Sequence, residues 1–241
     1  MSLKSLSLAT KSWAEQRQIP VHYEAEVEST NDWAKDRALS EGDALVIYLT
    51  GHQTKGRGRG VNQWLDTGAD ENLVNTWSLQ VGGAPQPISG PRVGLALFRT
   101  MVATWPSLSW SLKAPNDLLL NGLKMGGLLL ETISNGRDHR LLIGLGLNIL
   151  NHPRKFTEAT HLSSHLESPL REGDWFQFLD HLRQEFSSAV QESQSTTLTP
   201  SACRDLTLAL NANPKKVFTV KQISPQGDIE HSSGRISWLE L

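Results

Sequence analysis

The stretch Thr50–Trp64 reads TGHQTKGRGRGVNQW, and it decides how the rest of the sequence is interpreted. It follows an apolar, β-branched run, 44–49, that predicts a strand, and it combines glycines and cations ahead of a large aromatic residue. Glycine lets backbone N–H groups approach an oxyanion, the cations supply charge, and the indole offers a flat face to a ring. The cations are Lys55, Arg57 and Arg59. The stretch therefore predicts an anion-binding loop.

Two common anion-binding motifs do not fit this loop. Gly51 and Gly56 have the spacing of a phosphate loop, but Arg57 and Gly58 follow where that loop needs Lys and Ser or Thr. The dinucleotide fingerprint also fails, because the glycines fall as G-x-G-x-G and no long apolar helix follows. A flexible surface loop with solvated arginines stays open as an alternative from this segment alone.

Length and composition limit the class of protein. The chain has 241 residues, which suits one main domain with a small appendage. Its formal net charge of −2 gives no overall attraction to nucleic acid or to an anionic membrane. The single cysteine, Cys203, fits a reducing compartment, so we expect the cytoplasm. No run approaches the roughly 18 apolar residues of a membrane span, and residues 1–18 lack the apolar core of a secretory signal.

Hydrophobic periodicity predicts alternating strands and helices. The expected strands are 19–27, 44–49, 72–81, 108–112, 118–120, 125–130 and 141–149. The expected helices run from a cap at 28–31 to about Ala38, then over 93–105 and 173–192. Asn121-Gly122 predicts a tight hairpin that places Lys124 just after the turn, where an ordinary solvated lysine is the alternative. Gly144 and Gly146 inside a strand indicate that a ligand or another strand comes close.

The C-terminal part predicts a smaller unit. A polar linker, 193–200, marks a boundary between a large domain, 1–199, and a small β module, 200–241. Its strands are expected at 217–223 and 228–238. His161 and His165 have a helical spacing but no nearby third ligand, so we expect no metal site built from protein side chains.

Five short blocks lie between Ser29 and Asn148. They are Ser29-Thr30-Asn31, Gln53-x-x-Gly56-Arg57-Gly58-Arg59 with Trp64, Lys113-x-Pro115-Asn116-Asp117, Lys124-x-x-Gly127 with Glu131, and Gly144-x-Gly146-x-Asn148. Together and in this order they resemble biotin–protein ligases. The resemblance implies an α+β fold like that of class II aminoacyl-tRNA synthetases, with a mixed, mostly antiparallel sheet flanked by helices and a shortened SH3-like C-terminal module.

The resemblance also implies a two-step reaction. Biotin and ATP, with Mg²⁺ brought by the nucleotide, give biotinoyl-5'-AMP, and a lysine of a biotin carboxyl carrier protein then takes the biotin.

The implied catalytic residues are Arg57, Arg59, Lys124 and Asp117. The implied binding residues are Ser29, Thr30, Asn31, Gln53, Gly56, Arg57, Arg59, Trp64, Asn116, Lys124, Gly127, Gly144, Gly146 and Asn148. Among them, Ser29, Thr30 and Gln53 would bind the ureido ring, with room made by Gly56, Gly127 and Gly146. Trp64 would stack near the adenine, and Asn148 would read its edge.

The sequence also departs from the family pattern. Ala114 stands where a Trp is usual, and Val61-Asn62 replaces the usual Gly-Arg. Fewer than thirty residues precede Ser29, so we expect no DNA-binding repressor role. A homodimer is compatible with the resemblance. Two alternatives stay open: a lipoate or octanoate–protein ligase of the same fold, and a non-catalytic descendant that only binds a ligand.

Overall fold

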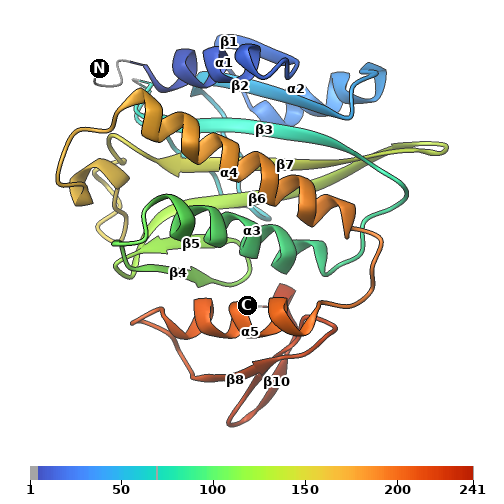
Figure 1. Cartoon of the computed structure of the whole chain (residues 1–241), viewed down its shortest axis with the longest axis vertical. Coiled ribbons are helices and arrows are strands. Elements are labelled where there is room, and N and C mark those ends of the chain that lie inside the picture. The colour runs from blue at the N-terminus through green and yellow to red at the C-terminus, as the bar shows by residue number, and fades with distance from the viewer. Residues whose placement is uncertain (1–4, 69, 241) are drawn as a thin grey trace.

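The computed structural model describes residues 5–68 and 70–240, and its central element is a seven-stranded sheet (Figure 1). The strand order is β1-β2-β3-β7-β6-β5-β4. The strands are β1 Val21–Val27, β2 Leu45–Gln53, β3 Asn72–Val81, β4 Trp110–Lys113, β5 Asp117–Leu120, β6 Leu123–Asn135 and β7 Asp138–Asn148. Strands β1 and β2 pair in parallel, and the other neighbours in this sheet pair antiparallel. The predicted mixed, mostly antiparallel sheet is confirmed.

Helices cover both faces of this sheet. They are α1 Leu6–Gln16, α2 Thr30–Arg37, α3 Ser89–Thr104, α4 Glu172–Gln191 and α5 Pro200–Asn211. Helices α3 and α4 cross in front of the sheet in Figure 1 and pack against each other over the main core. Helix α2 packs on the opposite face, where Ala34 and Ala38 contact Tyr48 of β2 and Leu142 of β7 in a separate apolar cluster. This second face carries the site described below.

The main core joins segments from both ends of the chain. The Trp13 ring of α1 lies 5.9 Å from the Trp77 ring of β3, which in turn lies 5.6 Å from Phe186 of α4. The Trp175 indole N–H of α4 donates to the Thr10 hydroxyl of α1 at 3.0 Å. Helix α1 therefore closes the core against α4.

The hairpins explain how Lys124 is presented. Asn121 and Gly122 have φ values of 52° and 73°, so the predicted two-residue turn between β5 and β6 is confirmed. Strand β6 is longer than the predicted range 125–130 and continues into a second long hairpin with β7, whose turn uses Gly136 at φ 61°.

The C-terminal part differs from the predicted β module. It begins with α5, which the sequence analysis missed although Thr199 caps it, accepting from the Ala202 N–H at 3.1 Å, and Pro200 occupies its first position. A three-stranded sheet follows, with β8 Val220–Ile223, β9 Ile229–His231 and β10 Gly234–Ile236. The predicted strand 228–238 is thus a hairpin followed by a 3₁₀ turn, η3 Trp238–Glu240. Apolar residues of this part belong to the same core cluster as the large sheet, and the division at residue 199 stays a prediction.

Candidate functional site

A cavity of about 640 Å³ opens where α2, the loop after β2 and the segment before β5 meet over β6 and β7. Most of the predicted site residues line it: Ser29, Thr30, Asn31, Gln53, Arg57, Arg59, Trp64, Asn116, Asp117, Lys124, Gly127, Gly144 and Gly146. Segments that are about 100 residues apart in sequence therefore form one site. Its volume is within the range of small-ligand pockets.

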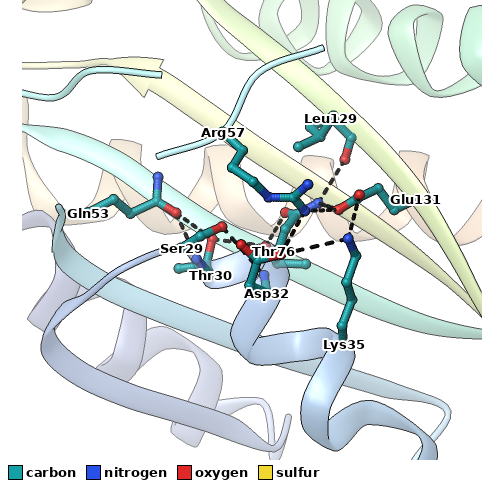
Figure 2. A network of polar contacts seen from close by, with 10 residues as sticks. Ser29, Thr30, Asp32, Lys35, Gln53, Arg57, Thr76, Leu129 and Glu131 are labelled. Atoms are coloured by element: carbon teal, nitrogen blue, oxygen red, sulfur yellow. Dashed lines mark hydrogen bonds and ion pairs between the residues drawn. The ribbon is translucent and has the colours of Figure 1, made fainter. Parts of the chain in front are cut away.

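The first turn of α2 forms a polar end of this cavity. The Ser29 hydroxyl caps the helix and accepts from the Asp32 N–H at 3.4 Å. The Thr30 N–H and hydroxyl both donate to Gln53 Oε1, at 2.8 and 3.0 Å. These bonds fix the Gln53 amide, and its nitrogen points away from Thr30 (Figure 2). Ser29 and Gln53 can each donate a hydrogen bond to a polar ligand.

An ionic network holds Arg57 beside the cavity (Figure 2). Its guanidinium pairs with Glu131 of β6 and lies 2.9 Å from Asp32 of α2. Glu131 also accepts from Lys35 at 2.6 Å and from Asn31 at 2.9 Å. Burial raises the pKa of Glu131, but the hydrogen bonds from Lys35, Asn31 and Arg57 outweigh it and hold that pKa below its ordinary value. Glu131 therefore stays a carboxylate that orients Arg57.

Lys124 and Asp117 face each other across the β5–β6 hairpin. Lys124 Nζ lies 2.6 Å from Asp117 Oδ1. The Asp117 side chain is 17% exposed and that of Lys124 is 44% exposed, so the lysine can reach a ligand. The Lys124 backbone is held as well, since its N–H donates to the Glu158 carbonyl at 2.8 Å and its carbonyl accepts from Thr160 at 2.9 Å. The structure thus brings two of the implied catalytic residues into contact.

Three of the glycines make room for protein groups, and their predicted roles toward a ligand stay predictions. A Cβ at Gly146 would lie 2.5 Å from the Trp64 indole, and a Cβ at Gly56 would collide with the Trp64 carbonyl. A Cβ at Gly144 would collide with the Asn31 amide. The space beside Gly56 and Gly146 is therefore filled by Trp64, while Gly127 has only ordinary contacts. The close approach predicted in β7 is made by side chains of the basic loop and of α2.

The predicted role of Asn148 at the adenine stays a prediction. Asn148 is buried, donates to the Thr160 carbonyl at 3.1 Å and accepts from Asn72 at 2.9 Å. Each end of its amide therefore makes one hydrogen bond within the fold, which leaves one N–H and one oxygen lone pair. Asn148 lies beside a neighbouring cavity of about 510 Å³ that Trp64 and Lys124 separate from the first.

Arg59 lies near the tip of the basic loop, which folds as a small hairpin with Arg57 paired to Gln63. Its guanidinium donates to the Leu239 carbonyl in the C-terminal turn η3. Gly60 takes the left-handed conformation at φ 64°, and the side chain of Val61 is fully exposed. The predicted phosphate-binding arginine thus contacts the C-terminal turn in this structure.

Several residues of the site were given no role from sequence. Glu131 was quoted in a motif, but Asp32, Lys35 and Thr76 were not singled out at all. Thr76 donates to Thr30 at 2.9 Å or to Asn31 at 2.6 Å and so supports the start of α2. Asp32 and Lys35 are one turn apart on α2, a spacing that only indicates a solvated helix face. Their contacts with the basic loop and β6 depend on the tertiary fold.

Two kinds of feature are absent from residues 5–68 and 70–240, the part of the chain that the structure describes. That part of the chain has no group of three or more His, Cys, Asp or Glu side chains placed to hold a metal ion. None of its helices is long and apolar enough to cross a membrane.

Comparison with solved structures places this fold among known ones. A biotin protein ligase of Aquifex aeolicus in complex with biotin and ATP aligns with a TM-score of 0.67 at 19% identity, covering 90% of this chain and 94% of that chain. The biotin protein ligase of Leishmania major in complex with biotin aligns with a TM-score of 0.62 at 22% identity, covering 90% and 98%. The predicted fold class is confirmed.

Sequence comparison gives the family. The biotin–[acetyl-CoA-carboxylase] ligase of Paracoccus denitrificans is 34% identical over 134 residues, which are 54% of each chain. The bifunctional ligase/repressor BirA of Escherichia coli is 32% identical over 130 residues, 51% of this chain and 38% of BirA. The match thus spans about half or less of these relatives. The model of the biotin/lipoate A/B protein ligase family matches residues 23–148, more than half of the 241 residues, and the chain belongs to that family.

Proposed function

We propose that the protein is an ATP-dependent biotin–protein ligase. It joins the biotin carboxylate to the α-phosphorus of ATP, releasing pyrophosphate, and then passes the biotinoyl group to a lysine amine with loss of AMP. The observation that carries the proposal is the single cavity in which the hydrogen-bonding start of α2, the cationic loop and the Lys124–Asp117 pair meet. Relatives in complex with biotin and ATP or with biotinyl-5-AMP support it.

The cavity has groups suited to the first step, which brings two anions together. Lys124 and the arginines of the basic loop would offset the charges of the carboxylate and the phosphates. The buried Arg57 Nε–H and Trp64 indole N–H have no hydrogen-bond partner in the described part of the chain, so each would gain a bond if a ligand moved the loop enough to reach it. Mg²⁺, entering with the nucleotide, would neutralise further negative charge on the phosphates.

The second step needs an amine in its neutral, nucleophilic form. Asp117 is the carboxylate at the cavity that can orient or partly deprotonate an incoming lysine. Its contact with Lys124 couples the two steps, because a ligand phosphate that attracts Lys124 would release Asp117. We propose a biotin carboxyl carrier protein as the acceptor and the cytoplasm as the compartment, in keeping with the single Cys203.

A substrate comparison tests the proposed function. The purified chain is incubated with ATP and Mg²⁺ and with biotin, lipoate or octanoate, and pyrophosphate release is measured, followed by mass spectrometry of an added carrier domain. We expect pyrophosphate and a biotin mass adduct with biotin. Turnover of lipoate or octanoate alone would show the alternative ligase of the same family. Calorimetric binding of biotin without any pyrophosphate would show a non-catalytic descendant.

A further inference from the structure

The C-terminal turn η3 touches two walls of the cavity. Trp238 is buried, and its indole N–H donates to the Pro115 carbonyl at 2.8 Å, directly before Asn116 and Asp117. The next residue, Leu239, accepts from Arg59 through its backbone carbonyl. One three-residue turn therefore contacts both the segment before β5 and the basic loop.

The Trp238 ring packs against α3. It lies over Gly90 and Gly94 of α3, where an added Cβ would be 3.9 Å from the ring at either position. Two glycines one turn apart leave the helix surface flat enough for an indole. A residual space of only about 10 Å³ is left between Trp238, Gly94 and the Pro115–Asp117 segment. The ring thus fills the space behind the segment that carries Asp117.

We infer that Trp238 is a positioning residue for the transfer step. This inference rests on the proposed function. The indole N–H fixes the Pro115 carbonyl, and this carbonyl belongs to the peptide unit that leads into Asn116. Asn116 in turn donates its side-chain amide to the Leu128 carbonyl at 2.9 Å. The segment is therefore held from behind by Trp238 and from the side by β6, which sets the direction of the Asp117 carboxylate.

Loss of the Trp238 hydrogen bond should affect the two half-reactions to different extents. Arg57 and the start of α2 make no hydrogen bond with the C-terminal turn in the described part of the chain. Lys124 contacts Asp117 but is also held by its backbone bonds to Glu158 and Thr160, and Arg59 bonds the backbone of Leu239 and not the Trp238 ring. Removing the Trp238 donor should therefore disturb adenylate formation less than transfer. Asp117 depends on the Pro115 contact. Loss of one hydrogen bond changes an equilibrium or a rate by about threefold to tenfold.

The test uses Trp238→Phe, which keeps an aromatic ring but removes the N–H donor. Trp175→Phe is the matched control, because Trp175 is also buried and loses one indole hydrogen bond, to Thr10 in the helix layer. Pyrophosphate release with biotin and ATP is measured first, and single-turnover transfer to a carrier domain second. We expect Trp238→Phe to slow transfer about threefold to tenfold with adenylate formation within about twofold of wild type, and Trp175→Phe to leave the ratio of the two steps unchanged.

Hydrogen–deuterium exchange of the peptide covering Lys113–Asp117 provides a readout that does not depend on turnover. Trp238→Phe should speed exchange there, and Trp175→Phe should not. Equal losses in both steps, unchanged transfer, or unchanged exchange would overturn the inference. If wild type makes no adenylate from biotin and ATP, the proposed function fails, and the exchange result alone then decides whether Trp238 positions the segment.

Discussion

Lys124 is held at its backbone and at its ammonium group, and the two contacts have different purposes. The backbone bonds to Glu158 and Thr160 place the residue, whereas the 2.6 Å contact with Asp117 keeps a half-exposed charge at the cavity. A substitution of the side chain leaves the backbone bonds intact. The structural and chemical contributions of this residue can therefore be measured separately.

Lys124→Ala is expected to abolish adenylate formation with little loss of stability. Removing a preorganised charge that stabilises a transition state lowers the rate by about 10² or more. The measurement is pyrophosphate release with biotin and ATP, with a thermal melt to confirm folding. Lys55→Ala is the control, because Lys55 lies in the same basic loop and forms an exposed ion pair with Glu28. Wild-type pyrophosphate release from Lys124→Ala would remove Lys124 from the proposed chemistry.

Asn75 is a buried polar residue of β3 that also belongs to the lining of the cavity of about 640 Å³. Its neighbour Thr76 faces α2, so alternation along the strand turns Asn75 toward the main core, between Leu49 of β2 and Leu145 of β7. Both atoms of its amide are buried without a hydrogen-bond partner among the described residues. An unpaired buried amide costs about 1–3 kcal/mol.

Asn75→Leu is therefore expected to stabilise the fold. A gain of about 1 kcal/mol would raise the Tm by roughly 2–4 °C for a chain of this size. The measurement is a thermal melt or urea unfolding. Asn72→Leu is the matched control on the same strand and should destabilise, because its amide bonds Thr67, Asn148 and Asn151. A lower Tm for Asn75→Leu would mean that the amide has an unrecognised partner such as a buried water.

At the scale of elements, the basic loop behaves as a hairpin. Val61 stands where the family usually has Gly, but Gly60 supplies the left-handed residue and Val61 is exposed at the tip. Asn62 brings no charge where the family usually has Arg, and its side-chain amide donates to the Arg59 carbonyl at 3.0 Å. We therefore expect the loop to close less tightly over an anionic intermediate than it would with an Arg at this position.

Asn62→Arg is expected to reduce leakage of the acyl-adenylate. An intermediate held under a weakly charged loop escapes and labels nearby lysines, so wild type should biotinylate itself when given biotin and ATP alone. The measurement is a streptavidin blot of the enzyme, with Val61→Arg as a control for charge placed one residue earlier. The idea fails if adenylate is made but wild type shows no label.

The loop after β7 contains a histidine pair behind Lys124. His152 Nδ1 lies 2.8 Å from His161 Nδ1, so one of the two nitrogens must be unprotonated. Burial lowers the pKa of His161, positive charge at His152 and His165 lowers it further, and Glu71 acts in the opposite direction. The same loop supplies Glu158 and Thr160, which bond the Lys124 backbone.

Stability should therefore fall as the pH drops below about 6.5, the ordinary pKa of histidine. In that range the unfolded chain binds a proton at His161 more readily than the folded chain does, so the free energy of unfolding rises with pH and reaches its full value above this pKa. The measurement is urea unfolding between about pH 5 and pH 8. His161→Gln should flatten the profile and His139→Gln should not. Equal slopes for wild type and His161→Gln would contradict the assignment.

For the whole molecule, the sequence predicted those features that depend on residues adjacent in the chain. Asn121-Gly122 fixed the β5–β6 hairpin, and the glycines of β7 correctly indicated a close approach. What came close was not predictable, because Asn31 and Trp64 are far from β7 in sequence. The partners of Arg57 were missed for the same reason, since Glu131 is 74 residues away. Helix α5 was missed despite its Thr199-Pro200 signal, because residues 193–200 were interpreted as a polar linker and the unit after it as a β module.

Asp180 of α4 binds the C-terminal end of α1. It accepts from the Trp13 indole at 2.9 Å and from Arg17 at 2.7 Å, joining α1 to α4. Asp180→Asn should lower the free energy of unfolding by about 1–2 kcal/mol, a value reduced by partial exposure of the pair. Asp174→Asn is the control, because its pairing with Arg171 is on the surface within α4. Equal changes in the urea midpoint would show that the α1–α4 contact adds nothing beyond apolar packing.

The same contact has a consequence for how the chain is made. Trp13 and Asp180 are 167 residues apart, and a ribosome adding about 5–20 residues per second needs on the order of 10 to 30 s to cover that distance. Throughout this time the apolar side of α1, with Leu6, Trp13 and Ala14, has no α4 to cover it. The nascent chain therefore carries an amphipathic segment with an uncovered apolar face for most of its synthesis. We expect chaperones that bind exposed apolar helices to recognise this segment. Without them, aggregation of unfinished chains would begin there.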